Sequence, residues 1–338
     1  TIGNHKVRGI GSYTYNLQQE LKSANSPVDF EFFKGPSFPP KADIVHYPYF
    51  DLFFHTLPIK RKAARVVTIH DVIPLVLPKY FEVGPKGYIN FFLQKLALRN
   101  VDAVICDSKT SKKDISVRLN YPENKIFVVY LAPAPQFRKI LKRNILDSVC
   151  KKYTLPKKFI LYVGDVNWNK NILNLLEAVK IAKINLVMVG LAIKDESSAQ
   201  SREITSSIKK LKIESYVLRT GFVNQGELIA IYNLTSVTVL PSYYEGFGLP
   251  LVESMACGTP VVCSNNSSLA EIGPPYVTFC DPDDPADIAK KIDDVVNLPT
   301  KDKDELSKKL ISHASKFTWQ KVAGQTIEVY KKLQSLQK

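Results

Sequence analysis

Short runs of β-branched and aromatic residues alternate along the whole chain with segments in which apolar residues recur at helical spacing, such as residues 84–99 and 109–119. Strands that alternate with helices predict parallel sheets covered by helices, the doubly wound α/β architecture. The expected strands, about eleven, span residues 28–33, 43–48, 65–71, 103–108, 126–132, 159–164, 184–190, 216–221, 237–242, 260–264 and 276–280.

So many strands exceed one sheet of ordinary size, so the pattern predicts two Rossmann-like domains. Residues 138–158 are basic and contain no strand-like run. We therefore expect an N-terminal domain over residues 1–145, a C-terminal domain over 146–316, and a final helix over 317–338 that crosses back to the first domain. Residues 10–21 have helical spacing but no strand before them. We expect the first strand of the N-terminal domain to be missing from the chain.

The composition indicates an ordered protein, because 45% of its 338 residues are hydrophobic. No apolar run reaches the length of a membrane span, about 18 residues. Five cysteines without CxxC spacing do not make a disulfide framework or a structural zinc site, which favours a reducing, cytoplasmic compartment.

The charge is concentrated in the first half, where residues 1–150 carry 22 Lys and Arg against 12 Asp and Glu, out of a net +14. A basic half can attract nucleic acid, anionic lipid headgroups or phosphorylated substrates, although a generally solvated surface explains it equally well. The bases are dispersed and are not interleaved with aromatic residues, which argues against nucleic acid.

Residues 243–262 carry the strongest functional pattern: Glu245 and Glu253 on either side of a Gly-Phe-Gly-Leu-Pro turn. A strand-like run ends just before the turn, and Pro250 suits the first turn of a helix. The turn is therefore expected at the carboxyl edge of a parallel sheet, where α/β proteins bind ligands.

The two glycines allow backbone N–H groups to approach a ligand, and a helix N-terminus favours negative charge, so a phosphate is the expected occupant. Glu253, one turn into the helix, is placed to accept hydrogen bonds from ribose hydroxyls. Glu245 is placed to bind hydroxyls beyond the phosphate. Two carboxylates around phosphates indicate a nucleotide sugar.

The sequence PSYYEGFGLPLVESMACGTPVV resembles the E-x7-E signature of retaining glycosyltransferases of family 4, the group 1 glycosyltransferases, which have the GT-B fold. Seven further blocks are similar to that family in the expected order. They are GIGSYTYNLQQEL, VVTIHDVIPLVLPKYF, CDSKTSKKDI, KIFVVYLAP, YVGDVNWNKNILNLLEAV, RTGFVNQGELIAIYN and NNSSLAEIG.

The resemblance implies a role for each matching residue. His70, Glu245 and Lys170 would be catalytic: Glu245 would contact the donor sugar, Lys170 would stabilise the leaving diphosphate, and His70 would approach the donor sugar from the N-terminal domain. The donor-binding residues would be Gly9, Gly11, Gly221, Phe222, Val223, Gly246, Phe247, Gly248, Leu249 and Glu253. Neither a metal ion nor another cofactor is expected, because the nucleotide sugar is a substrate and no Asp-x-Asp pair follows a strand.

Two positions depart from the family, which usually has an arginine at one of them; here they are Asp165 and Asn169. One phosphate-neutralising charge is therefore absent.

Structural explanations remain for other residues: His70 can cap a turn, and residues 9–11 can form a simple turn. Residues 268–271 are interpreted as a helix capping box, without a catalytic role.

The predicted function is transfer of a hexosyl unit, with retention, from GDP-mannose or a UDP-sugar to a glycan or a polyprenyl-phosphate-linked acceptor, in cell-surface polysaccharide synthesis. The protein is expected in the cytoplasm, in peripheral contact with anionic membrane, without nucleic acid as a partner. A nucleotide-dependent dehydrogenase is the alternative enzyme, but the turn lacks the third glycine of G-x-G-x-x-G. A basic nucleic-acid or membrane-binding module would explain the charge and leave the glycine turn unexplained.

Overall fold

The computed structural model describes residues 9–24, 26, 28–33, 42–60 and 63–335 of the chain. These residues form two units. Unit 1 contains the chain up to Ala132 together with the segment from Thr318 onward, and unit 2 contains Pro133–Phe317. Each unit is built around its own parallel sheet, which confirms the expected α/β class.

The sheet of unit 1 has the strand order β1-β2-β3-β4, and each neighbouring pair is parallel. All five residues of β2 are buried, as expected for an inner strand covered on both faces. The strands are β1 (Ile44–Tyr47), β2 (Ala64–Thr68), β3 (Ala103–Cys106) and β4 (Ile126–Val128).

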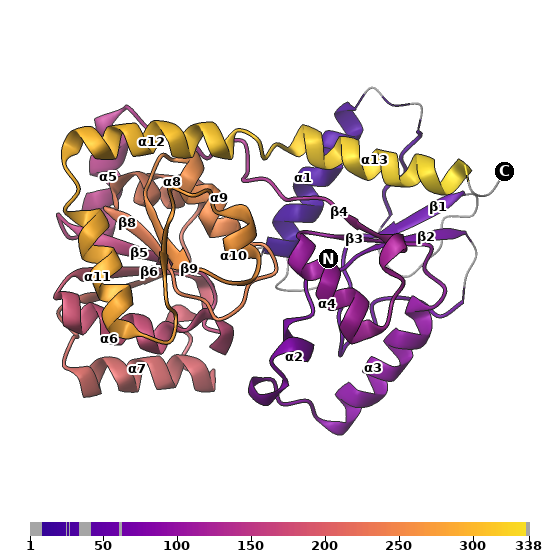
Figure 1. Cartoon of the computed structure of the whole chain (residues 1–338), viewed down its shortest axis with the longest axis horizontal. Coiled ribbons are helices and arrows are strands. Elements are labelled where there is room, and N and C mark those ends of the chain that lie inside the picture. Colours follow the sequence, from indigo (N-terminus) through magenta and orange to yellow (C-terminus); the bar gives the residue numbers. More distant parts are fainter. Residues whose placement is uncertain (1–8, 25, 27, 34–41, 61–62, 336–338) are drawn as a thin grey trace. The chain divides into compact units, whose positions relative to one another are not determined.

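Helices cover both faces of this sheet (Figure 1): α1 and α13 pack against each other on one face, and α2, α3 and α4 lie on the other. Thr318 caps α13 through a hydrogen bond that its hydroxyl oxygen accepts from the Lys321 N–H. The helices are α1 (Gly9–Ser23), α2 (Ile73–Val76), α3 (Pro85–Leu98), α4 (Lys109–Leu119) and α13 (Trp319–Ser335), with short 3-10 turns η2 (Pro78–Tyr80) and η3 (Glu123–Lys125).

The sheet of unit 2 has the order β10-β9-β8-β5-β6-β7, again with parallel pairs throughout. Its strands are β5 (Phe159–Val163), β6 (Asn185–Val189), β7 (Val217–Gly221), β8 (Val237–Leu240), β9 (Val261–Ser264) and β10 (Thr278–Cys280). Because the strands are parallel, their carboxyl ends meet at one edge of the sheet, and the predicted donor-binding residues of unit 2 lie at this edge or at the start of the helix that follows it.

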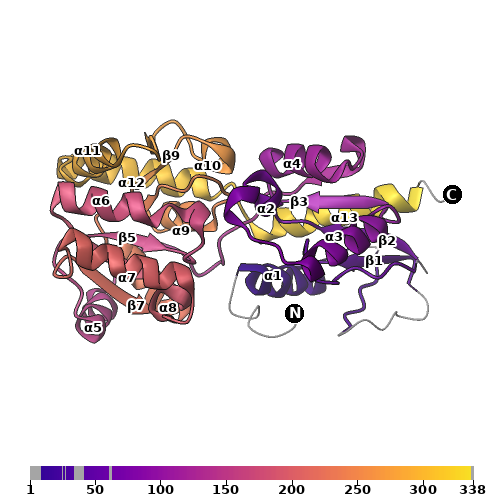
Figure 2. The same ribbon diagram turned by 90° about the horizontal axis from the view of Figure 1, so that it is seen from below.

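Two buried clusters form the core of unit 2, one on each face of its sheet. One contains α6, α7 and α11, and the other contains α5 and α8; Figure 2 views unit 2 from the side of α6 and α7. The helices are α5 (Arg143–Tyr153), α6 (Ile172–Ala182), α7 (Ala199–Leu211), α8 (Gln225–Leu234), α9 (Leu249–Ala256), α10 (Ser267–Ile272), α11 (Pro285–Val296) and α12 (Thr300–Ala314), with 3-10 turns η4 (Trp168–Lys170) and η5 (Leu191–Lys194).

The strand expected over residues 28–33 is wrong, because these residues have no strand conformation. Phe32 and Phe33 are 41% and 39% exposed, and the Phe30 ring packs 6.4 Å from the ring of Tyr330 on α13. Alternating apolar residues form a strand only with a partner to complete the ladder, and none of the described residues pairs with this run. The first strand, which was expected to be missing, would fall before residue 9, outside the described residues.

The boundary between the units also differs from the expected one at residue 145, since unit 2 begins at Pro133. The physical reason is packing: Ala134 and Phe137 join Val149 and Leu155 in a buried cluster with Tyr232 of α8. The basic segment therefore belongs to unit 2 well before its helix α5 starts. The C-terminal helix α13 is assigned to unit 1.

Candidate active site

Lys170 and Glu245 form an ion pair at the carboxyl edge of the sheet in unit 2. The Lys170 Nζ donates hydrogen bonds to both carboxylate oxygens of Glu245, each at 2.7 Å. Lys170 follows β5 and Glu245 follows β8, and these two strands are neighbours in the sheet. Only 20% and 10% of the two side chains is exposed, so solvent screens this pair less than an ordinary surface pair.

Three serines hold Glu245 in place. The Ser242 hydroxyl donates to Glu245 Oε1 at 2.7 Å, the Ser267 hydroxyl oxygen accepts the Glu245 N–H at 3.0 Å, and the Ser268 hydroxyl donates to the Glu245 carbonyl at 2.9 Å. The capping box expected at residues 268–271 is therefore wrong, since α10 already begins at Ser267 and Ser268 turns toward the glutamate. Sequence reasoning missed these roles, although all three serines follow strands at the same sheet edge.

The loop between β5 and α6 is fastened to the loop after β8. Asn169 is buried, its side-chain amide donates to the Tyr244 carbonyl at 2.9 Å, and its own carbonyl accepts the Tyr243 N–H at 2.8 Å. The Trp168 ring stacks on the Tyr243 ring with 4.6 Å between centroids. Asn169, at a position where arginine is usual in the family, thus ties the two loops together and leaves Lys170 as the only cation of residues 164–171.

The turn that follows Glu245 requires glycine at one position. Gly248 has φ +91, and a Cβ atom there would lie 2.7 Å from Leu269 Cδ2. Phe247 is buried, with its ring 6.2 Å from that of Phe317. Leu249 and Pro250 open α9, where Pro250 has no N–H group and the Leu251 N–H donates to the Gly248 carbonyl at 2.9 Å. The N-terminus of a helix favours negative charge. Gly246 lies in the turn between Glu245 and Phe247.

Glu253 lies one turn inside α9, where the Tyr232 hydroxyl donates to its Oε2 at 2.9 Å. Burial raises the pKa of the Glu253 carboxyl to about 7, while the hydrogen bond from Tyr232 acts in the opposite direction. A carboxyl with this pKa changes charge near neutral pH.

Gly221, Phe222 and Val223 leave the carboxyl end of β7, the edge strand separated from β5 by β6. Gly221 has φ +76, Val223 is buried, and the Phe222 ring is 56% exposed. The Phe222 ring is therefore available for contact with an apolar or aromatic group.

His70 follows β2 in unit 1 and is paired with a buried aspartate. Its Nδ1 donates to Asp107 Oδ2 at 2.7 Å. Burial disfavours the charged imidazole, but the Asp107 carboxylate outweighs it and raises the pKa of His70. Asp107 follows β3, the neighbour of β2, so its position at the same sheet edge was a signal that sequence reasoning did not use.

Gly9 and Gly11 lie in the first turn of α1, Gly9 exposed and Gly11 buried. The ring of Tyr13, about one turn further on, meets the His70 ring edge to face at 4.7 Å, so the start of α1 lies beside His70. The Tyr13 hydroxyl is hydrogen-bonded to Thr68 at 3.0 Å. In unit 1 the structure therefore brings the start of α1, with Gly9 and Gly11, close to His70. In unit 2 the predicted residues gather at the sheet edge of that unit.

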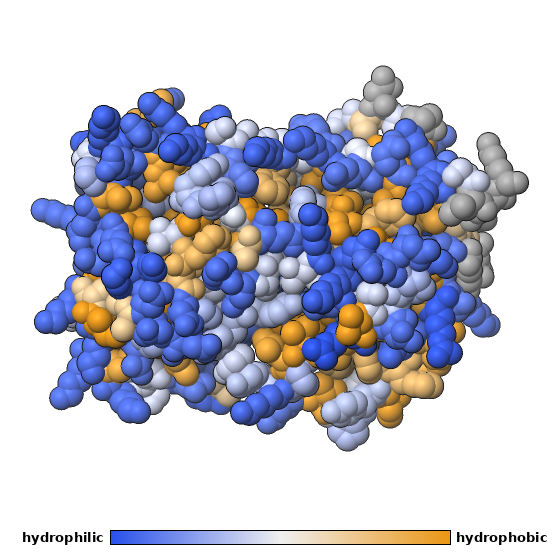
Figure 3. Space-filling view, viewed as in Figure 1, coloured by the Kyte–Doolittle hydropathy of each residue, from blue (hydrophilic) through white to orange (hydrophobic). Residues whose placement is uncertain are grey.

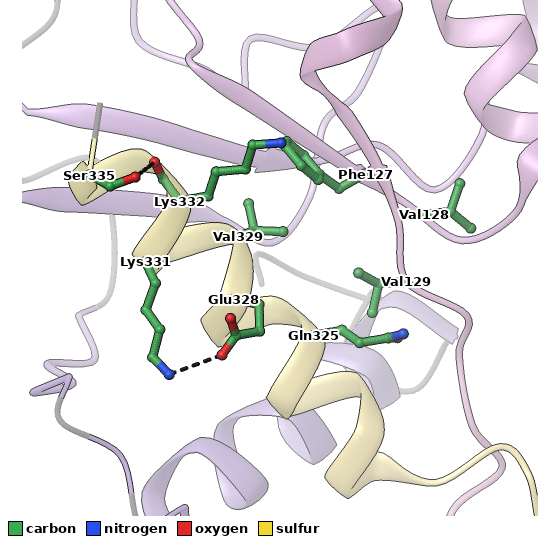
Figure 4. A pocket seen from close by; sticks show the side chains of 9 residues that line it. All are labelled: Phe127, Val128, Val129, Gln325, Glu328, Val329, Lys331, Lys332 and Ser335. Atoms are coloured by element: carbon green, nitrogen blue, oxygen red, sulfur yellow. Dashed lines mark hydrogen bonds and ion pairs between the residues drawn. The ribbon is translucent and has the colours of Figure 1, made fainter. Parts of the chain in front are cut away.

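A hollow of about 530 Å³ lies elsewhere in unit 1, between β4 and α13 (Figure 4). Phe127, Val129 and Val329 line it, and Lys332 Nζ lies 4.9 Å from the centroid of the Phe127 ring. None of the predicted site residues lines this hollow.

Among the described residues, no cluster of three or more His, Cys, Asp or Glu side chains has the arrangement of a metal site. The five cysteines, all within the described part, are free thiols. Within that same part, none of the helices has both the length and the apolar character to span a bilayer.

Two units with parallel sheets, and a glycine turn between two glutamates at the carboxyl edge of the second, are the arrangement of the GT-B fold. Residues 151–317 match the family "Glycosyl transferases group 1", and residues 33–132 match "Glycosyltransferase Family 4". The chain belongs to the family 4, group 1 glycosyltransferases.

Curated relatives include mannosyltransferases of bacterial O-antigen synthesis. The chain is 29% identical to O-antigen chain mannosyltransferase B of Escherichia coli, over 84% of this chain and 75% of that protein. It is also 29% identical to the serotype-specific mannosyltransferase WbdA of Escherichia coli over 79% of this chain, but it spans only 33% of WbdA's length.

Solved structures share the fold at lower identity. Sucrose-phosphate synthase from Thermosynechococcus elongatus has a TM-score of 0.69 at 23% identity, covering 82% of this chain and 69% of that one. Anabaena Alr3699/HepE in complex with UDP and glucose has a TM-score of 0.68 at 19% identity, covering 80% and 72%.

Proposed function

We propose that the protein transfers a hexosyl unit, preferentially mannosyl, from a nucleoside diphosphate sugar to an acceptor hydroxyl with retention of anomeric configuration and without a metal ion. The observation that carries the proposal is the Lys170–Glu245 pair beside the turn at Gly248. One partially buried cation, one fixed carboxylate and a helix N-terminus suit a sugar joined to a diphosphate.

In this proposal unit 2 binds the donor. The Leu249 N–H at the N-terminus of α9 and the Lys170 ammonium hold the diphosphate, Glu253 accepts hydrogen bonds from the ribose, and Phe222 and Val223 lie against the base. Glu245, fixed by its serines, accepts hydrogen bonds from the sugar hydroxyls and stabilises positive charge at the anomeric carbon. Glu245 also keeps Lys170 extended toward the site before the donor arrives.

The chemical step breaks the bond between the anomeric carbon and the β-phosphate oxygen. The acceptor oxygen forms its bond on the same face of the sugar, and its proton passes to the departing phosphate oxygen. Negative charge therefore develops on the leaving diphosphate, where the Lys170 ammonium stabilises it electrostatically. We propose that His70, held by Asp107 and raised in pKa, supplies a hydrogen bond to the reacting sugar, and that Gly9 and Gly11 let the start of α1 approach the substrates.

The O-antigen mannosyltransferases among the relatives support mannose as the sugar and cell-surface polysaccharide synthesis as the process, with a glycan or polyprenyl-phosphate-linked acceptor. Anabaena Alr3699/HepE, whose structure holds UDP and glucose, supports a nucleotide sugar donor in general. We further propose a cytoplasmic protein that makes peripheral contact with an anionic membrane.

A donor panel tests the proposal. The purified chain is incubated with a glycan acceptor and with GDP-mannose, UDP-glucose or UDP-galactose, with EDTA present, and released nucleoside diphosphate is measured. The anomeric configuration of the new linkage in the product is then read by NMR. Release from GDP-mannose and a product with the donor's configuration are expected. No release from any donor would refute the transferase activity, an inverted product would refute retention, and activity lost with EDTA and restored by Mg²⁺ would refute metal independence.

A further inference from the structure

The outward face of α3 is apolar where a surface helix is normally polar. Tyr88, Ile89 and Phe92 are 64%, 62% and 62% exposed, and their spacing puts them on one side of the helix. Large apolar side chains exposed in one turn of a helix mark a surface that binds something.

The opposite face of α3 is fixed to unit 1, so the exposed side chains are not core residues in a displaced helix. The fully buried Gln94 side chain donates to the Asp51 carbonyl at 2.8 Å and to the Thr56 hydroxyl at 2.7 Å. Asn90 donates to the Phe53 carbonyl at 2.8 Å. Because both amides hold the same loop, α3 presents its outward face in a defined orientation.

The chain segment that carries this face is basic. Residues 78–99 contain four basic residues, Lys79, Lys86, Lys95 and Arg99, against the single acid Glu82. Lys79 and Lys86 are exposed, and Lys95 Nζ lies 5.6 Å from the centroid of the Phe91 ring. Figure 3 shows apolar and strongly polar residues mixed over the region of α2 and α3.

We propose that Tyr88, Ile89 and Phe92, the α3 outer face, insert into the headgroup region of an anionic lipid bilayer, with the neighbouring lysines on the lipid phosphates. The charge excess complements anionic lipid, and exposed aromatic side chains flanked by lysines suit an interface that is apolar on one side and charged on the other. A protein partner would not need this charge excess. The inference deepens the proposed function and rests on it, because an acceptor carried on a lipid lies at such a surface.

Vesicle flotation of the whole chain tests the inference. We expect binding to vesicles of phosphatidylcholine with about 30% phosphatidylglycerol, weak binding to phosphatidylcholine alone, and loss of most binding in about 0.5 M NaCl. The triple variant Tyr88→Ser/Ile89→Ser/Phe92→Ser should bind the anionic vesicles at least about tenfold more weakly. The variant Lys86→Glu/Lys95→Glu should also bind more weakly and lose much of the salt dependence.

A matched control changes apolar residues of equal exposure elsewhere in unit 1, Tyr15 (62%) and Val117 (67%). The variant Tyr15→Ser/Val117→Ser should bind vesicles like the wild type, and thermal melting followed by circular dichroism checks that every variant is folded. Equal binding by the wild type and the triple variant, or no binding by the wild type, would overturn the inference. So would concentration-dependent dimerisation that the triple variant abolishes without any vesicle binding, because it would assign the face to a second copy.

Nucleotide binding separates this inference from the proposed function. Titration of the triple variant with GDP and UDP should give the wild-type affinity, since α3 lies outside the nucleotide site. Vesicle binding by a wild type that releases no nucleotide from any donor would refute the transferase proposal and leave the lipid-binding face supported. Donor cleavage by a wild type that binds no vesicles would support the transferase proposal and refute the lipid-binding face.

Discussion

The pKa of Glu253 predicts that nucleotide affinity depends steeply on pH near neutrality. Its carboxyl is buried and accepts a hydrogen bond from Tyr232, and its pKa lies at about 7 against an ordinary value of 4.5. If only the ionised carboxylate holds the ribose, about a tenth of the free protein is competent at pH 6 and about nine tenths at pH 8. The apparent Kd should therefore be about tenfold lower at pH 8 than at pH 6.

Isothermal titration with GDP and UDP at pH 6, 7 and 8 measures this dependence. The terminal phosphate of the nucleotide titrates in the same range, so the decisive quantity is the difference between the wild type and Glu253→Gln. The variant should bind more weakly at pH 8 and should lose the part of the pH dependence that comes from the protein. Glu177→Gln, which changes an exposed carboxylate on α6, is the matched control and should behave as the wild type.

The variant Tyr232→Phe gives a second test, in which the direction of the pKa change of Glu253 is known in advance. The hydrogen bond from Tyr232 lowers the pKa of Glu253, so its loss should raise that pKa further and move the midpoint of binding to higher pH. Identical pH dependence in the wild type and Glu253→Gln would refute the assignment of Glu253 to the ribose. A midpoint that moves to lower pH in Tyr232→Phe would refute the electrostatic reasoning.

Three further predictions concern the scaffold around the site. Asp107→Asn should lower the pKa of His70, read from the NMR titration of its ring, because the carboxylate that raises it is gone; an unchanged titration would contradict the pairing. Gly248→Ala should cost about 2 kcal/mol of unfolding free energy in urea, because φ is +91 and Leu269 is close; a cost within error of zero would contradict this. Removal of the His46 ring from solvent lowers its pKa to about 3 from 6.5. Its stabilising contribution is therefore complete above pH 6.5 and is lost as pH falls toward 3, by about 1.4 kcal/mol per pH unit. His46→Gln should flatten that slope in urea unfolding, and an equally steep slope would show that other groups cause it.

The arrangement of sheets was predictable because local patterns carry it. Strand runs separated by helical spacing define parallel sheets wherever each strand finds a neighbour, and ten of the expected runs do. Residues 28–33 have the composition of a strand but no pairing partner in the part of the chain that the structure describes. Pairing is a long-range property that a local pattern does not contain. The domain boundary was misplaced for a similar reason, since Phe137 packs against Tyr232, far away in sequence.

At the site, the sequence predicted which residue types gather at the sheet edge but not how they are supported. Glu245 and Lys170 follow neighbouring strands, so their meeting follows from the strand order. The support of Glu245 by Ser268 did not follow, because a serine near the start of a helix has a local alternative as a cap. At Asn169 the sequence indicates a missing positive charge, and only the packed structure shows that its amide ties two loops together.

The central claim is that Lys170 and Glu245 together catalyse cleavage of the donor. The rate of GDP release from GDP-mannose tests it most directly. Glu245→Gln should lower kcat by about 100-fold with little change in GDP affinity, and Lys170→Met should lower both kcat and GDP affinity. Glu177→Gln and Lys180→Met, which alter exposed residues of α6 in the same unit, should retain the wild-type rate. Rates within about twofold of wild type for both site variants would contradict the claim.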